Sequence, residues 1–431
     1  MKHLYIYILF IALLVSSSSF AQQTPGSKQT KAIAIVGATA HIGNGQIIEN
    51  SVLVFENGKI TSVNSGSANT SGMTVIDAKG KHVYPGFIAA NSALGLVEVD
   101  AVRASDDQNE IGAMIPHVRS LIAYNTESKV VESMRPNGVL MAQVSPKGGR
   151  ISGTSSIVQL DAWNWEDASI KTDDGIHLNW PSSFSRGRWW LGEPAGLKPN
   201  KEYANQINEV TTFITDSKAY LKGNKKPKHL PFEAMQGLYN GSQKLFVHVD
   251  DEKGIADAIY FAKNNNIEHL VIVGGAEAYK VTDLLKQQNV PVLINTPHTL
   301  PANDDQDYDM PFKLAKILHD AGIVVGIQVG NAENFQTRNL PFFAGTCAAY
   351  GIVKEEALKL ITSNTAKILG IDSFAGTLEA GKDATLFISE GDALDMRTNI
   401  LTQAFIQGRE ISLESHQTEL WRRYSEKYKN Q

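Results

Sequence analysis

The sequence predicts an α/β protein in which two short all-β segments flank one larger body of alternating strands and helices. The body, residues 86–375, repeats apolar strands followed by helix-like stretches, as in LFVHV (245–249) before GIADAIYFAKNNN. Units of this size favour parallel strands, arranged either as an α/β barrel or as an open doubly wound sheet. The flanks, residues 22–85 and 376–412, instead have the short apolar runs and tight turns of β structure.

The first 21 residues have the pattern of an export signal. A positively charged start precedes an apolar run from Leu4 to Val15, and Ser19-Phe20-Ala21 forms a small-residue cleavage site. The run is too short to span a bilayer comfortably, so an uncleaved anchor is the weaker interpretation. We therefore predict cleavage after Ala21 and a periplasmic or secreted protein. Because no later apolar stretch has membrane length, we expect no membrane span after cleavage.

Composition and cysteine content restrict the classes of partner and of chemistry. The chain has 431 residues, of which 42% are hydrophobic and 20% charged, as in an ordinary globular protein. Its formal net charge of −5 gives no reason to expect nucleic acid as a partner. Cys347 is the single cysteine, so no internal disulfide can form. Its small apolar neighbours, AGTCAAYG, favour a packed core residue over a nucleophile.

The two flanking segments are expected to meet in one small domain. In the first, Asn57-Gly58 stands between the apolar runs SVLVFE and KITSV and is a strong hairpin signal. In the second, GTLEAGKDATLFIS and AFIQGREIS have the same strand character. The simplest arrangement joins residues 22–85 and 376–412 in a β-sandwich beside the body. Residues 413–431 are expected to form a charged C-terminal helix or tail.

A dinucleotide site near the N-terminus is an alternative that the local sequence opposes. The apolar strand IAIVGATAHIG runs into Gly37, and Glu56 lies at roughly the spacing of a ribose-binding acid. Phosphate binding in that motif needs a helix after the glycines. The segment HIGNGQIIEN contains two glycines and two asparagines, which are poor helix formers. We therefore favour a strand and turn here.

The junction VIDAKGKHVYPGFIAANSALGL (75–96) resembles the amidohydrolase superfamily. There, a small β-sandwich passes the chain to a TIM barrel through Pro-Gly-Phe/Leu-Ile-Asp-x-His-x-His. Further segments are similar to the imidazolonepropionase-like branch, namely NGVLMAQVSPKGGRISGTSSIVQL, HVDDEKGIADAI, VIVGGAEAYKVTDLL and EEALKLITSNTAKILGI. The resemblance covers about 32–412 and implies a TIM-like (β/α)8 barrel over 86–375 with a composite β-sandwich domain.

The resemblance also implies a metal centre, commonly zinc, at the barrel mouth. Family members take two His from the first strand, one each from the fifth and sixth, and an Asp from the eighth. Here the first-strand positions are Asn91 and Ala93, and the sixth-strand position is Gly274. The eighth-strand acid falls near Val329, whose polar neighbours are Gln328 and Asn331.

His248 is the one residue that matches a ligand position, and Asp250 follows it where some relatives have His. A zinc site normally needs three protein ligands, so these two do not make one. We therefore predict that the metal centre is missing and that zinc would be the cofactor if the family chemistry were retained. The expected pocket is built from residues around the vacated centre: Asn91, His248, Asp250, Glu277, Asn331 and Arg338.

Two functional hypotheses follow from this resemblance. The first is a non-catalytic binding or assembly subunit, whose partner is an intact amidohydrolase relative, a second copy of the chain, or a small-molecule or peptide ligand. The second is an active hydrolase of C–N bonds, in non-peptide or cyclic amides, acting through an atypical site around His248 and Asp250.

Other side chains near the predicted mouth have two interpretations. His117 and His298 could rebuild a metal site, but isolated histidines are more often loop or core residues. Four tryptophans could line a face for a sugar or peptide, or simply pack under long loops; they are Trp163, Trp165, Trp189 and Trp190.

Overall fold

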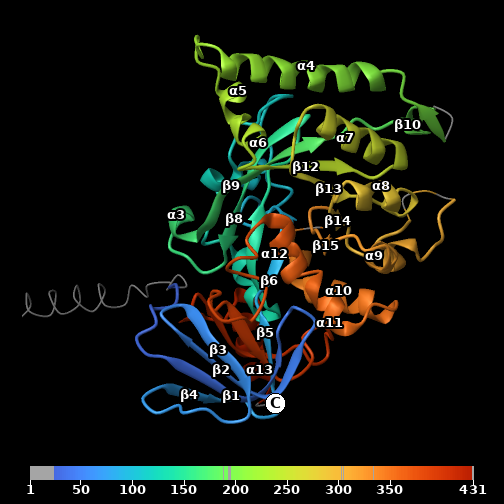
Figure 1. Ribbon diagram of the computed structural model, residues 1–431. Helices are drawn as coiled ribbons and strands as arrows, with labels where there is room; N and C mark the ends of the chain where they lie inside the picture. Colours follow the sequence, from blue (N-terminus) through green and yellow to red (C-terminus); the bar gives the residue numbers. More distant parts are fainter. Residues whose placement is uncertain are drawn as a thin grey trace, which may run out of the picture.

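The computed structural model describes residues 24–429 except 188, 193–195, 302, 304 and 333. The predicted export signal therefore lies outside the described residues. Two sheets of eight strands dominate the structure, one formed by both ends of the chain and one by its middle. Figure 1 shows the blue N-terminal and red C-terminal segments together below the barrel. Within the described residues, no helix is both long and apolar enough to cross a membrane.

The sheet formed by the two ends of the chain has the order β18-β17-β16-β5-β1-β2-β3, with β4 beside β1. Its strands are β1 (Ile33–His41), β2 (Ile47–Glu56), β3 (Lys59–Ser65), β4 (Thr74–Asp77), β5 (His82–Pro85), β16 (Leu386–Ser389), β17 (Leu401–Ile406) and β18 (Arg409–Glu410). C-terminal β16 pairs antiparallel with N-terminal β5, which joins the two ends. The sheet is curved, so that β3 meets the segment before β16, where Ile60 N donates to Lys382 O at 2.9 Å. Leu53, Phe55 and Phe405 fill its core.

The turn signals of this domain act as expected. Asn57 and Gly58 have φ of 52° and 79°, and they connect the antiparallel pair β2 and β3. Positive φ at both central residues is the conformation that a tight hairpin needs, and Asn-Gly tolerates it best. Strand β1 pairs directly with β2, so no helix intervenes where a dinucleotide phosphate would sit.

The middle of the chain forms a closed barrel in the order β6-β7-β8-β9-β12-β13-β14-β15. Its strands are β6 (Phe87–Ser92), β7 (Val139–Val144), β8 (Ile151–Gln159), β9 (Ser169–Asn179), β12 (Lys244–Val249), β13 (Leu270–Gly274), β14 (Val292–Ile294) and β15 (Val325–Ile327). A parallel bridge between Ala90 and Gln328 closes the last strand onto the first. The predicted fold class, a TIM-like barrel with a composite β domain, is confirmed.

One part of the barrel departs from the expected strand–helix alternation. Strand β8 runs antiparallel to both β7 and β9, so the second, third and fourth strands form a meander. From β12 onward the expected alternation holds, because each connection between strands carries a helix. The helices longer than four residues are α4 (Tyr203–Lys222), α5 (Leu230–Ala234), α7 (Glu252–Asn264), α8 (Thr282–Gln287), α9 (Met310–Asp320), α10 (Leu340–Ala349), α11 (Lys354–Lys359), α12 (Ser363–Leu369) and α13 (His416–Lys429).

The barrel helices cover the strands with apolar stripes. In α7, the buried residues Ile255, Ala258, Ile259 and Ala262 recur at helical spacing and face the strands. The stretch EEALKLITSNTAKILG forms two helices, α11 and α12. The break falls at Ile361-Thr362, two β-branched residues that lose rotamer freedom in a helix.

A buried ionic cluster ties the composite sheet to the barrel. The Asp161 carboxylate accepts from Arg135 Nη1 at 3.0 Å and from Arg409 Nη1 at 2.9 Å. The three side chains are at most 15% exposed, and Arg409 belongs to β18 of the sheet. Each buried charge therefore has an opposite charge beside it, which is the condition under which charges are tolerated away from water.

Candidate functional site

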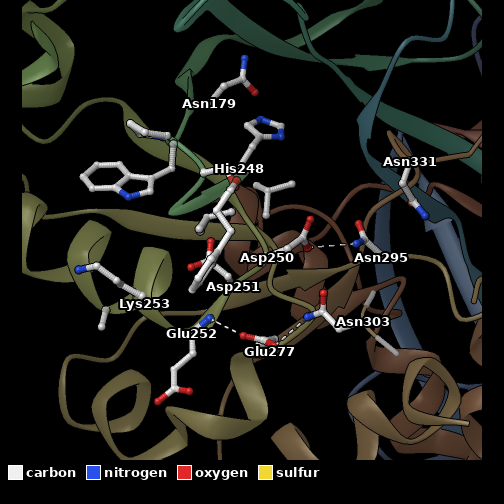
Figure 2. A pocket seen from close by; sticks show the side chains of 18 of the residues that line it. Asn179, His248, Asp250, Asp251, Glu252, Lys253, Glu277, Asn295, Asn303 and Asn331 are labelled. Carbon is white, nitrogen blue, oxygen red and sulfur yellow. Dashed lines mark hydrogen bonds between the residues drawn. The ribbon is translucent and has the colours of Figure 1, made fainter. Parts of the chain in front are cut away.

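A cavity of 1480 Å³ opens at the carboxyl ends of the barrel strands. Parallel strands bring the residues that follow them to one edge, so segments distant in sequence meet there. Among its lining residues are amides, carboxylates and lysines: Asn91, Asn179, Asn295, Asn303, Gln328 and Asn331; Asp250, Asp251, Glu252, Glu277 and Asp305; Lys147, Lys253 and Lys280. Figure 2 shows Asp250, Asn295 and Asn331 from three different connections around the same space.

Five of the six expected pocket residues line this cavity: Asn91, His248, Asp250, Glu277 and Asn331. The sixth, Arg338, was placed wrongly. It lies in the 3-10 helix η6 (Asn334–Asn339), where its carbonyl accepts from Asn137 Nδ2 at 2.7 Å. Its guanidinium lies 5.8 Å from the Phe335 ring centre, and it is absent from the described lining residues. The chain turns away from the mouth after Asn331, which a spacing argument could not reveal.

A chain of side-chain amides crosses the floor of the cavity. Asn91 Nδ2 donates to Gln328 Oε1 at 2.9 Å, and Gln328 Nε2 donates to Asn295 Oδ1 at 2.5 Å. Asn91 has φ of 50°, a left-handed conformation that Asn tolerates better than most residues. Asn295 is not among the predicted pocket residues, because it does not stand at or beside a position that carries a ligand in the family pattern.

The amide chain continues into the closed interior of the barrel. Gln143 Oε1 accepts from Asn91 N at 3.0 Å, and Gln143 Nε2 donates to Asp174 Oδ2 at 2.8 Å. Ser155 Oγ donates to the other Asp174 oxygen at 2.7 Å. Burial raises the pKa of Asp174 to about 6, because no cation contacts this carboxyl among the described side chains. Gln143 and Asp174 therefore hold the floor from below and do not face a ligand.

His248 is held by a second histidine that sequence reasoning did not identify. His248 Nε2 and His177 Nδ1 lie 2.9 Å apart, and the His177 ring stacks on Phe246 with a centroid distance of 4.9 Å. Burial lowers the pKa of both imidazoles, that of His248 to about 4. Both rings are therefore neutral at physiological pH, and one nitrogen of His248 is already committed to a protein partner.

Asp250 is open to the cavity, whose walls surround it. Its Oδ1 accepts from Ala276 N at 3.2 Å and from Asn295 Nδ2 at 3.3 Å. Burial, together with the nearby Asp251 and Glu277 carboxylates, raises its pKa despite these two hydrogen bonds. No hydrogen bond joins Asp250 to His248 in the described part of the chain, so the two do not form a dyad.

Glu277 has a structural role at the rim. Its Oε2 accepts from Glu252 N at 2.8 Å, and its Oε1 accepts from Lys280 Nζ at 2.9 Å and Asn303 Nδ2 at 3.1 Å. These contacts, two of which are drawn in Figure 2, pin together the connections after β12, β13 and β14. Both oxygens of Glu277 are thus engaged by the protein.

Comparison with known proteins finds a partial match to one family and a shared fold. The sequence matches the model of the amidohydrolase family over residues 240–411. It is 32% identical over 113 residues to amidohydrolase tasK of Hapsidospora irregularis, a match that covers 24% of this chain and only 11% of that protein. The C-terminal part of the chain thus resembles the amidohydrolase family.

Solved structures share the architecture of this chain. An amidohydrolase from Thermotoga maritima MSB8 has a TM-score of 0.77 and 23% identity, covering 88% of this chain and 99% of that one. Molinate hydrolase has a TM-score of 0.53 and 12% identity, covering 90% of this chain and 95% of that one. At these identities the likeness establishes the fold and leaves the chemistry to the site itself.

The amidohydrolase family implies a metal, often zinc, and the residues present do not fit one. Nowhere in the described residues do three or more His, Cys, Asp or Glu side chains converge as a metal site would need. The space at Gly274, and at Gly330 beside Val329, which are predicted ligand positions, is also filled by other groups. A Cβ on Gly274 would lie 2.6 Å from Asp250 Oδ1, and one on Gly330 would lie 2.5 Å from Asn91 Nδ2. Neutral amides are weak ligands for zinc, which prefers imidazole, thiolate and carboxylate.

The remaining candidates lie away from the cavity. His298 Nε2 is 2.7 Å from Thr346 Oγ1 and lines a separate surface depression with α10. Trp163 is 66% exposed, and Trp165 packs against the barrel core. Trp180, which follows β9, is the tryptophan named among the described lining residues, and its indole N–H donates to Tyr203 Oη at 3.0 Å. The remaining predicted residues add nothing to this lining: His117 and Trp190 are not named in it, and the Trp189 side chain lies outside the description.

Proposed function

We propose that this chain is an exported amidohydrolase-superfamily protein that lacks the metal centre and binds a ligand in the barrel mouth without hydrolysing it. The observation that carries the proposal is the refilling of the ligand positions. The carboxylate of Asp250 occupies the space beside Gly274, and the amides of Asn91 and Gln328 occupy the space beside Gly330. A side chain cannot be restored at either glycine without displacing a hydrogen-bonded neighbour.

The chemistry of the floor supports the same proposal. Hydrolysis of a C–N bond needs a group that activates water, and in this superfamily a metal lowers the pKa of that water. The floor instead presents neutral amides that are bonded to one another. His248, the one matching ligand, already bonds to His177. The cavity that remains is large, polar and lined by fixed side chains, which suits binding of a small molecule or peptide.

A second candidate, an active hydrolase of non-peptide or cyclic amides, is favoured by one observation. Asp250 is open to the cavity and its pKa is raised, as in many general bases and acids. If this candidate holds, D250N abolishes a measurable amidase activity. An activity that survives both D250N and H248N would contradict it.

Export and partnership belong to the same proposal. The predicted cleavage after Ala21 supports a periplasmic or secreted location, and a refilled site supports an assembly role beside an intact relative or a second copy. Cell fractionation with an epitope placed after Lys429 tests the location. Pull-down from the exported fraction, followed by light scattering, tests the partnership. Retention of the protein in the cytoplasm would contradict the first.

The decisive experiment is elemental analysis of the purified mature chain with a parallel assay of C–N hydrolysis. We expect well below one metal ion per chain after dialysis, no uptake of stoichiometric zinc on reloading, and no turnover of amide, cyclic amide or carbamate substrates. Stoichiometric metal, with turnover lost in both H248N and D250N, would overturn the proposal. A contaminating hydrolase from the expression host would also give turnover. The H248N/D250N double variant, purified in the same way, is therefore the control for contamination.

A further inference from the structure

Two oppositely charged side chains on the cavity wall have no ionic partner. Lys147 follows β7, and its Nζ donates to Gly330 O at 3.1 Å. Asp250 follows β12 and accepts only from an amide side chain and a backbone N–H. In the part of the chain that the structure describes, neither residue forms an ion pair, and both line the same cavity. The other two lysines of the cavity lining are paired, Lys253 with Asp257 at 2.8 Å and Lys280 with Glu277 at 2.9 Å.

The protein holds the two charges apart. Lys147 bonds to the carbonyl of Gly330, and Gly330 N donates to Gln328 Oε1 at 2.5 Å. Gln328 Nε2 donates to Asn295, whose own amide donates to Asp250. The ammonium and the carboxylate thus stand at the two ends of one hydrogen-bonded chain. Among the described residues no ion pair joins these two groups directly.

An enclosed charge without a counter-charge is costly to the folded protein. Burial lowers the pKa of Lys147, whereas the Asp250 side chain is exposed to the cavity. Lys147 has therefore lost part of its solvation, and nearby Asp100 and Asp106 raise its pKa without forming an ion pair with it. A ligand that brings one positive and one negative group would supply both missing partners. The amides between the two charges would then bond to the ligand's neutral middle.

We propose that the cavity binds a small zwitterionic ligand, whose protonated nitrogen pairs with Asp250 and whose anionic group pairs with Lys147. This inference rests on the proposed function, since the ligand is held and not cleaved. Free amino acids and short peptides carry this pair of charges. The cavity of 1480 Å³ has room for either, and the separation that the site prefers is an outcome of the test.

The test is isothermal titration of the purified mature chain with free amino acids and dipeptides, each with its N-acetylated and C-amidated counterpart. We expect at least one zwitterion to bind, and blocking either end to weaken binding by about tenfold or more. Binding by amino acids alone identifies the short spacing, and binding by dipeptides alone identifies the longer one. If blocked and free forms bind equally, or if no probe binds, the inference is wrong.

Variants assign each end of the ligand. D250N should weaken the free-amine form about tenfold and leave the N-acetylated form unchanged, and K147M should do the same for the carboxylate end. K316M and E268Q, which change an ion-paired lysine and an exposed carboxylate outside the cavity lining, are the matched controls and should not alter affinity. Cleavage of a bound dipeptide would refute the proposed function alone, whereas equal effects of D250N on free and N-acetylated forms would refute this inference alone.

Discussion

Two regions of this molecule enclose charged side chains, and they treat those charges in opposite ways. At the junction of sheet and barrel, Asp161 contacts Arg135 and Arg409, so each charge has a counter-charge. At the barrel mouth, Lys147 and Asp250 line one cavity without an ionic partner among the described residues. The junction charges hold distant parts of the chain together. The mouth charges form hydrogen bonds to neutral groups only, so each remains available to an oppositely charged ligand group.

The largest effect is expected at the junction. D161N leaves two buried guanidinium groups without a counter-charge, so we expect it to lower the free energy of unfolding by about 3–5 kcal/mol. Urea denaturation followed by circular dichroism measures this loss. D320N, which removes the exposed i,i+4 pair of Lys316 and Asp320, is the control and should cost less than about 0.5 kcal/mol. Equal losses in the two variants would show that the junction cluster does not depend on pairing.

A pH-dependent effect is expected from Asp174 beneath the floor. Its folded pKa of about 6 lies above its ordinary value of 3.8, so between these values the folded state holds a proton that the unfolded chain has released. This contribution to stability is full at low pH and is lost as pH rises from about 4 to 6, by at most about 3 kcal/mol. D174N removes it. The stability of D174N relative to wild type should therefore rise between pH 4 and pH 7 in urea denaturation.

A difference between D174N and wild type that stays constant from pH 4 to pH 7 would contradict this assignment. Asp250 titrates in both proteins, so its contribution cancels in the comparison.

A smaller loss of stability is expected from a substitution at Gly330, next to the amides of the cavity floor. A Cβ at Gly330 would meet the Asn91 amide at 2.5 Å and the Asn91 carbonyl oxygen at 2.6 Å. We expect G330A to cost about 1–3 kcal/mol, because it overpacks the amide floor. Gly223 provides the matched control, since a Cβ there would make only ordinary contacts of 3.5 Å. If G330A were as stable as G223A, the floor would be looser than the hydrogen bonds indicate.

The smallest effect on stability is expected for D250N. Asparagine keeps the oxygen that accepts from Ala276 and Asn295 but removes a charge that has no counter-charge. The free energy of unfolding should be unchanged or raised by up to about 1 kcal/mol, in contrast to D161N. Thermal and urea denaturation measure it. A loss comparable to that of D161N would mean that Asp250 has a structural role and would remove the distinction between the two regions.

Much of the fold could be predicted from the sequence because its signals are local. The Asn57-Gly58 hairpin, the Pro85-Gly86 junction and the strand–helix units after residue 244 each depend on neighbours in the chain. The same logic brought five of six pocket residues to one place, since the ends of parallel strands share an edge. The same logic did not hold for Arg338, which is not among the described lining residues, or for β8, which runs antiparallel to both of its neighbours.

The sequence by itself determined which residues stand at the positions where the family pattern predicts metal ligands, because a motif can be aligned without knowing the fold. Only the tertiary structure decided what replaced them. Asn91 and Gln328 are 237 positions apart, and His177 and His248 are 71 apart, yet each pair is hydrogen-bonded. Whether Lys147 and Asp250 have counter-charges also depends on side chains from every connection around the mouth. Pairing is a property of distance in space, and the order of residues along the chain does not contain it.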